Sequence, residues 1–278
     1  MKSYLLLVLF LSSASLSAQV KIQKLWETDT TQLRTPESVL WDPKTSSLYV
    51  TNIDGAAWNA DKNGFISTMS TNGTIQTLRW VTGLNAPKGM GIAKGKMYVA
   101  DITDVAVIDV YSGAIVRKIQ PEGAKQLNDV AISPDGDVYV SDSGTGRIYL
   151  IKGKKASIFL ESPDLQRPNG LKFVGNRFFV ITSGSGLFYE VKADKSLVKL
   201  AEGLPSGDGI ESNGDDFILS RWEGIMHYLH ADGKLEEILD LKSQKKNTAD
   251  IGFDPVKKII YVPTFNGNTV AAYQLITP

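Results

Sequence analysis

Six segments of the chain share one pattern of hydrophobic and polar positions. Each segment has a short polar turn, an apolar strand, a second turn, and a second β-rich strand ending in a small or acidic residue. The six apolar strands open at Glu37, Lys88, Asn128, Asn169, Asp208 and Ala249. Successive opening positions are 51, 40, 41, 39 and 41 residues apart. Such regular spacing indicates one supersecondary unit repeated six times along the chain.

The pattern within each repeat predicts strands and no helices. Apolar and polar residues alternate as they do in half-buried strands, and Asn-Gly or Asp-Gly pairs such as Asn72-Gly73 and Asp135-Gly136 mark tight turns. The predicted second strands are Ser47–Thr51, Lys96–Asp101, Asp137–Asp142, Arg177–Thr182, Asp216–Arg221 and Lys258–Thr264. Four strands in about forty residues form one propeller blade, so we predict an all-β, six-bladed β-propeller. A two-sheet sandwich is the alternative, but it gives no reason for the even spacing.

Two departures from the repeat concern the first and last blades. The sixth segment lacks an outermost strand, and Val20–Glu27 is a strand candidate with no partner of its own. We expect this N-terminal strand to complete the sixth blade and so leave no exposed edge. The long first step reflects an insertion at Asn52–Asn63 that contains Trp58. Such a loop either covers a pocket or is a passive elaboration, and both interpretations stay open here.

The first eighteen residues have the features of a signal peptide. Lys2 precedes the apolar run Leu5–Leu11, and a stretch rich in Ser and Ala ends at Ala18. The apolar run is shorter than the roughly twenty residues that span a bilayer. We therefore predict a signal peptide over 1–18 and a single propeller domain over 19–278, exported to the periplasm or secreted. The chain has no cysteine, which excludes disulfides, thiol nucleophiles and thiolate metal sites.

The charge balance limits the classes of partner. The chain has 30 basic and 30 acidic residues and a formal net charge of zero. This balance removes the electrostatic reason to expect nucleic acid, or an anionic membrane once the signal is removed. A small-molecule substrate or a protein partner remains.

The opening positions carry the candidate chemistry, because the innermost strands of a propeller converge on its axis. Glu37, Asn128, Asn169 and Asp208 offer two carboxylates and two amide oxygens from four blades. Hard oxygen ligands of this kind suit Ca²⁺, Mg²⁺ or Mn²⁺, and also a Zn²⁺ that keeps bound water. Taken singly, Asn169-Gly170 and Asp208-Gly209 could be turn formers. The different chemistry at one repeat position favours a site.

Other catalytic arrangements lack the residues they need. His227 and His230 are the only histidines, and their spacing puts them on opposite faces of a strand, where they do not share a metal. Neither lies near an opening position, so a Ser-His-Asp triad is not supported. No glycine-rich segment precedes a helix, so a nucleotide site is not supported either.

Four motifs resemble the signatures of the gluconolactonase, regucalcin and senescence-marker-protein family. They are Pro36-Glu37-Ser38-Val39-Leu40-Trp41, Asn128-Asp129, Pro168-Asn169-Gly170-Leu171 and Ser206-Gly207-Asp208-Gly209. Their order and spacing match the family over essentially the whole mature chain. The resemblance implies a six-bladed propeller with one divalent cation at the mouth of its channel. Ca²⁺ is the expected ion, with Zn²⁺, Mn²⁺ and Mg²⁺ as alternatives, and Glu37, Asn169 and Asp208 are the implied ligands.

The same resemblance implies hydrolysis of a lactone or a related ester, with metal-bound water as nucleophile and Asp208 accepting its proton. Asn128 would contact the metal, its water or the substrate. Sugar-lactone members carry Arg where this chain has Gln126, which points away from gluconolactone itself. Lys88 is a further departure, and it could bind an anionic substrate group or pair with Glu37. The alternative is a non-catalytic propeller, similar to NHL-repeat proteins, that binds a small ligand or a protein partner.

Overall fold

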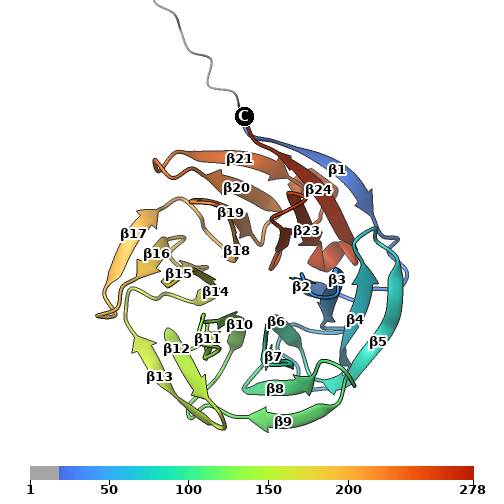
Figure 1. Cartoon of the computed structure of the whole chain (residues 1–278), viewed down its shortest axis with the longest axis vertical. Helices are drawn as coiled ribbons and strands as arrows, with labels where there is room; N and C mark the ends of the chain where they lie inside the picture. The colour runs from blue at the N-terminus through green and yellow to red at the C-terminus, as the bar shows by residue number, and fades with distance from the viewer. Residues whose placement is uncertain (1–18) are drawn as a thin grey trace, which may run out of the picture.

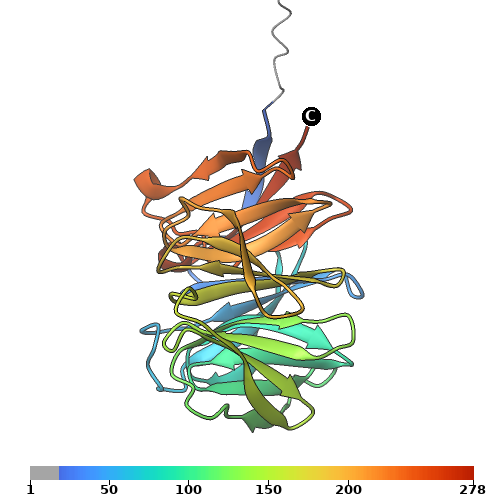
Figure 2. The ribbon, with the colours of Figure 1, turned by 90° about the vertical axis from the view of Figure 1, so that its left-hand side faces the viewer.

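The computed structural model describes residues 19–278, so the predicted signal peptide at 1–18 lies outside the described residues. Six antiparallel four-stranded sheets surround a central axis (Figure 1). Seen from the side, the sheets are stacked next to one another around the ring (Figure 2). The prediction of a six-bladed β-propeller is confirmed.

In each of the first three blades, the four strands follow chain order from the innermost to the outermost strand. Blade 1 contains β2 (Pro36–Asp42), β3 (Ser47–Asn52), β4 (Gly64–Ser70) and β5 (Ile75–Leu84). Blade 2 contains β6 (Pro87–Ala93), β7 (Lys96–Asp101), β8 (Asp104–Asp109) and β9 (Ile115–Ile119). Blade 3 contains β10 (Leu127–Ile132), β11 (Val138–Asp142), β12 (Arg147–Lys152) and β13 (Lys155–Glu161).

The next two blades repeat this order, and the last blade is composite. Blade 4 contains β14 (Pro168–Val174), β15 (Arg177–Thr182), β16 (Phe188–Val191) and β17 (Leu197–Ala201). Blade 5 contains β18 (Gly207–Asn213), β19 (Asp216–Arg221), β20 (Ile225–Leu229) and β21 (Leu235–Asp240). Blade 6 contains β22 (Gly252–Asp254), β23 (Ile259–Pro263), β24 (Val270–Ile276) and, outermost, β1 (Lys21–Glu27).

Strand β1 closes the ring as the sequence predicts. It pairs antiparallel with β24 from Lys21↔Ile276 to Glu27↔Ala271. The Glu27 carboxylate accepts hydrogen bonds from Lys246 Nζ and Thr269 Oγ1, both at 2.6 Å. The closure therefore combines a strand ladder with a charged hydrogen-bond cluster.

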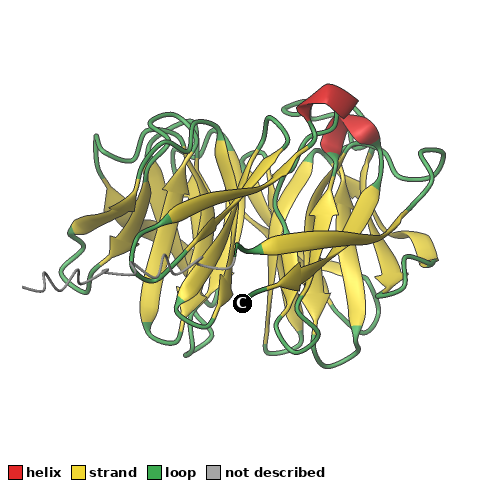
Figure 3. Ribbon diagram, turned by 90° about the horizontal axis from the view of Figure 1, so that it is seen from above, coloured by secondary structure: helices red, strands yellow, loops and turns green. Residues whose placement is uncertain are grey.

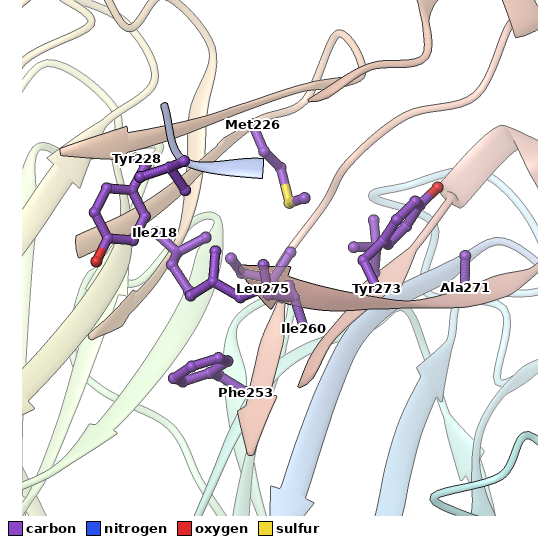
Figure 4. Packing of buried hydrophobic residues seen from close by; sticks show 11 residues of the cluster. Ile218, Met226, Tyr228, Phe253, Ile260, Ala271, Tyr273 and Leu275 are labelled. Carbon is purple, nitrogen blue, oxygen red and sulfur yellow. The ribbon is translucent and has the colours of Figure 1, made fainter. Parts of the chain in front are cut away.

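The hydrophobic core lies between neighbouring blades. Figure 4 shows one of its clusters, in which Ile218, Met226 and Tyr228 of blade 5 lie against residues of blade 6 such as Ile260 and Leu275. Each of these side chains is at most 4% exposed. Burial of a side chain of this size contributes about 1.5–3 kcal/mol, so these contacts hold adjacent sheets face to face.

Five innermost strands have a β-bulge at the repeat's opening position. Their registers shift between Pro36/Val39, Pro87/Met90, Leu127/Val130, Pro168/Leu171 and Gly207/Ile210. A bulge leaves residues out of the ladder and re-aims their side chains. In alternate blades a hydroxyl of the second strand accepts a backbone N–H of the bulge: Ser38 N to Thr51, Asp129 N to Ser141, and Gly209 N to Ser220.

Short 3-10 turns are the only helical elements in residues 19–278. They are η1 (Lys242–Gln244) and η2 (Phe265–Gly267), which lie together on one face of the ring (Figure 3). None of the helical elements in the described part of the chain has the length and apolar character needed to cross a membrane.

Candidate functional site

A cavity of about 400 Å³ is lined by residues at the start of the innermost strands and by Phe265 of η2. Its wall contains residues from all six blades. They are Glu37, Ala57, Trp58, Lys88, Asn128, Arg167, Asn169, Ser183, Ser206, Asp208, Trp222 and Phe265. The cavity therefore brings together five of the six predicted site residues, all from repeat opening positions.

Gln126 is the predicted site residue that does not line this cavity. Its backbone N–H is held at 3.0 Å by Asp142 Oδ1, and its side chain lies beside Gly144. Arg167 stands in the equivalent position of the next blade, two residues before Asn169, and does line the cavity. The repeat spacing would have identified Arg167, because the same offset before Asn128 gave Gln126.

Glycines beside the opening residues allow neighbouring blades to approach. A Cβ on Gly170 would lie 2.0 Å from the backbone oxygen of Asp208, and one on Gly89 would lie 2.1 Å from Asp129 Oδ1. Asn169-Gly170 and Asp208-Gly209 thus lie in strands β14 and β18, and the turn interpretation of these pairs is wrong. The glycines are needed for close approach between blades, and this approach places the opening residues together on the axis.

The two carboxylates of the cavity are buried and incompletely bonded. Glu37 is 4% exposed and Asp208 is 3% exposed. Glu37 Oε2 and Asp208 Oδ1 have no hydrogen-bond partner among the described residues. Each of these oxygens is therefore free to accept a hydrogen bond or to bind a cation.

Burial changes the proton affinity of both groups. It raises the pKa of Glu37 to about 7, with Lys88 opposing and Asp129 adding to the rise. Burial and the charges of Glu37 and Asp129 raise the pKa of Asp208 well above its usual range, against the opposing effects of Lys88 and a hydrogen bond from Asn169. A charge that enters this cavity therefore changes the free energy of ionisation of both carboxylates.

Ser143 engages the amide nitrogen of Asn128. Asn128 Nδ2 donates to Ser143 Oγ at 3.1 Å, and this hydroxyl donates to the Pro168 carbonyl at 2.7 Å. Since this nitrogen is engaged, the Asn128 carbonyl oxygen remains available as an acceptor or metal ligand. The amide of Asn169 also lines the cavity, together with Asp208.

Lys88 connects the insertion to the floor of the cavity. Its side chain is buried, Nζ donates to the Ala57 carbonyl at 2.9 Å, and Nζ lies 4.2 Å from the centroid of the Trp58 ring. Burial lowers the pKa of Lys88, while the charges of Glu37, Asp208 and Asp101 raise it. The insertion is therefore part of the cavity wall, and Lys88 holds it there.

The donor set fits a divalent cation held mainly by oxygen. Two carboxylates with unpartnered oxygens and two amide oxygens supply ligands of the type Ca²⁺ prefers. No group of three or more His, Cys, Asp or Glu side chains in residues 19–278 could hold a metal ion, so any such ion depends on the amides as well. The Lys88 ammonium opposes the cation and reduces its affinity.

The two histidines lie away from this cavity. His227 is a buried residue of β20, and His230 follows that strand with Nε2 at 3.5 Å from Glu236 Oε2. Neither side chain belongs to the cavity wall.

A second cavity of about 400 Å³ has the buried Asp129 and the partly buried Lys172, Glu211 and Asp250 in its wall. Asp129 accepts the N–H of Leu171 at 2.6 Å, which links blade 3 to blade 4. Ser38 donates to Asp250 at 2.5 Å, which links blade 1 to blade 6. These carboxylates are already hydrogen-bonded across blade boundaries, which is a structural role.

Comparison with known proteins gives a family match and a fold match. The family model described as "SMP-30/Gluconolactonase/LRE-like region" matches residues 35–217. A search of curated protein sequences finds no significant match. A structure of virginiamycin B lyase from Staphylococcus aureus with quinupristin aligns over 93% of this chain and 100% of its own, with 14% identity and a TM-score of 0.67. A streptogramin B lyase aligns over 92% and 98%, with 10% identity and a TM-score of 0.68.

A protein of unknown function from Bacteroides thetaiotaomicron is similar to the same degree. The alignment spans 93% of this chain and 76% of the Bacteroides protein, with 14% identity and a TM-score of 0.66. At these identities the likeness extends to the propeller fold alone.

Proposed function

The chain belongs to the SMP-30/gluconolactonase/LRE-like family, and we propose that it is an exported, divalent-metal-dependent hydrolase of a lactone or related ester. One observation supports this proposal most strongly. Glu37 and Asp208 each have a buried, unpartnered oxygen at the axial cavity, beside the amides of Asn128 and Asn169. Purely structural carboxylates, such as Asp129 in the same fold, are hydrogen-bonded instead.

Glu37, Asn169 and Asp208 are the residues we propose to hold the metal. A bound divalent cation supplies Lewis acidity to a substrate carbonyl and stabilises the negative charge that develops on its oxygen. Ca²⁺ suits this neutral and anionic oxygen set best, with Zn²⁺, Mn²⁺ and Mg²⁺ as alternatives.

The residues of the chain supply the remaining functions. Water adds to the acyl carbon, the acyl C–O bond breaks, and the departing oxygen takes up a proton. In this proposal Asp208 accepts the proton of the water, because Oδ1 has no hydrogen-bond donor among residues 19–278. Asn128, whose amide is oriented by Ser143, would hold the water or the substrate.

Calorimetry on the mature chain tests the metal site. Chelator-stripped protein is titrated with Ca²⁺, Mn²⁺ and Zn²⁺, and we expect saturable binding of about one ion per chain. Asp208→Asn should abolish binding and hydrolysis together. Asp240→Asn, at an exposed carboxylate of β21, is the matched control and should change neither.

The activity is tested on the same preparations with a panel of lactones and esters. Hydrolysis that is lost on chelation and restored by the ion supports the proposal. Ion binding with no hydrolysis of any member would contradict it and would favour the partner-binding propeller. The export step is tested by the N-terminal sequence of the mature protein, which should begin at Gln19.

A further inference from the structure

The aromatic side chains at the mouth of the axial cavity are gathered on one side. Trp58 of the blade 1 insertion, Trp222 after β19 of blade 5 and Phe265 in η2 of blade 6 form an aromatic arc across three adjacent blades. Trp222 and Phe265 meet edge to face, with centroids 5.5 Å apart. Trp222 is 39% exposed, so part of its ring is available to a ligand.

Blade 4 places a cation beside this arc. Arg167 is exposed, lines the cavity, and makes no ion pair with any residue of 19–278. Its backbone is fixed in a left-handed conformation, with φ at 55°. The Arg167 carbonyl accepts Ser183 N–H at 2.9 Å and Ser183 Oγ at 3.1 Å, which holds this conformation. The base of the side chain is therefore fixed while its guanidinium stays available.

We propose that the substrate is an ester or lactone with a flat apolar group that carries an anionic substituent. The apolar group would lie along the aromatic arc, and its anion would bind Arg167 at the edge of the arc. The reacting carbonyl would then reach the carboxylates and amides of the floor. The proposal rests on the proposed function, because it takes the anion to be part of the substrate.

The mouth of the cavity is complementary to a ligand of this kind in shape and in charge. Aromatic rings at the mouth favour a flat apolar ligand, because such a ligand loses water-exposed surface against them. An unpaired guanidinium offers a planar fork that matches a carboxylate or a similar oxyanion.

Binding and hydrolysis are measured separately to test this inference. The binding probe is para-acetamidobenzoate, an amide that resists hydrolysis, and its neutral partner is para-acetamidobenzamide, which contains no ester. Calorimetry should show the anionic probe binding about tenfold or more tightly than the neutral one, because charge-assisted hydrogen bonds are worth this much. The hydrolysis pair is para-acetoxybenzoate and its methyl ester, with gluconolactone as the sugar substrate.

Arg167→Gln should remove the preference for the anionic probe, and Arg167→Lys should restore part of it. Arg117→Gln, on the outer strand β9, is the control and should change neither pair. Trp222→Ala should weaken both aromatic probes equally, because it shortens the arc without changing charge.

Two results separate failure of this inference from failure of the proposed function. An Arg167-dependent preference for the anionic probe with no ester hydrolysis would keep the ligand class and refute the hydrolase. Hydrolysis of neutral esters or gluconolactone with no effect of Arg167→Gln would keep the hydrolase and overturn this inference.

Discussion

Replacing Lys88 by methionine tests how charge is balanced inside the axial cavity. Methionine keeps the length of the side chain and removes its charge. Lys88 is only 2% exposed, and its ammonium donates to the Ala57 carbonyl and lies over the Trp58 ring. It also lowers the cost of burying Glu37 and Asp208, each of which has one oxygen without a hydrogen-bond partner among residues 19–278.

The expected magnitude follows from two opposing effects. Removing one member of a buried charge cluster typically costs about 3–5 kcal/mol. Part of this cost is offset because methionine avoids burying an ammonium and because Glu37, with a pKa of about 7, can take up a proton. We therefore expect the metal-free variant to lose about 2 kcal/mol, which lowers Tm by roughly 4–8 °C for a domain of this size.

Adding Ca²⁺ should narrow the difference in Tm between the two proteins. The variant lacks a positive charge beside the proposed ion, so its Kd for Ca²⁺ should fall at least tenfold, on the order of 1.4 kcal/mol. Thermal unfolding in chelator and in saturating Ca²⁺ measures both effects, and calorimetry measures the Kd. Lys155→Met, on the exposed edge of β13, is the control. Equal Tm values in chelator together with equal Ca²⁺ affinities would refute the reasoning.

Three further predictions concern how the fold holds the site. Gly170→Ala places a Cβ 2.0 Å from the Asp208 backbone oxygen, so it should lower the free energy of unfolding by about 3 kcal/mol, measured with denaturant. Gly55→Ala is the control, because its nearest neighbour is the flexible Asp61 carboxylate at 3.0 Å, and it should cost less than about 1 kcal/mol. Ser143→Ala removes the acceptor for Asn128 Nδ2 and the donor to the Pro168 carbonyl, so it should cost about 1–3 kcal/mol of stability. It should also lower kcat more than about tenfold with a KM change below about threefold, and an equal change in both constants would contradict a positioning role. Burial opposes ionisation of Glu27, but hydrogen bonds from Lys24, Lys246 and Thr269 outweigh it and lower its pKa from 4.5 to about 2. This stability is complete above pH 4.5 and lost as pH falls towards 2, so Glu27→Gln should cost about 2 kcal/mol at neutral pH and flatten the acid limb of the stability curve.

The architecture could be predicted because the repeat determines it. The predicted second strands at Lys96–Asp101, Arg177–Thr182 and Asp216–Arg221 match β7, β15 and β19 end to end. Of the other three, β3 and β11 differ from the prediction by one residue at one end, and β23 differs by one residue at each end. The N-terminal strand β1 likewise begins at Lys21 and not at Val20. The alternation of apolar and polar residues and the turn residues are local features of the sequence. They therefore predict the position of each strand directly.

Only the site residues that occupy the repeated opening position could be predicted from the sequence. Glu37, Lys88, Asn128, Asn169 and Asp208 share one position of the innermost strand, so convergence on the axis follows from the fold. The aromatic arc does not follow, because Trp58, Trp222 and Phe265 occupy different loops with no common spacing. The role of Gly170 was also hidden, since glycine after asparagine signals a turn equally well as a close approach between blades.

The pairing of β1 with β24 joins the first and last strands of the propeller, which are the furthest apart in sequence. Lys21 pairs with Ile276, 255 positions further along the chain. The entropy of closing so long a loop is lost before the contact is formed, and such non-local contacts slow folding. A chain that emerges from a ribosome or a translocon in sequence order would complete blades 1 to 5 first and could seal the ring only after its last strand has appeared. The assembled ring would then resist local opening, because separating any two blades requires this final contact or a core interface to break.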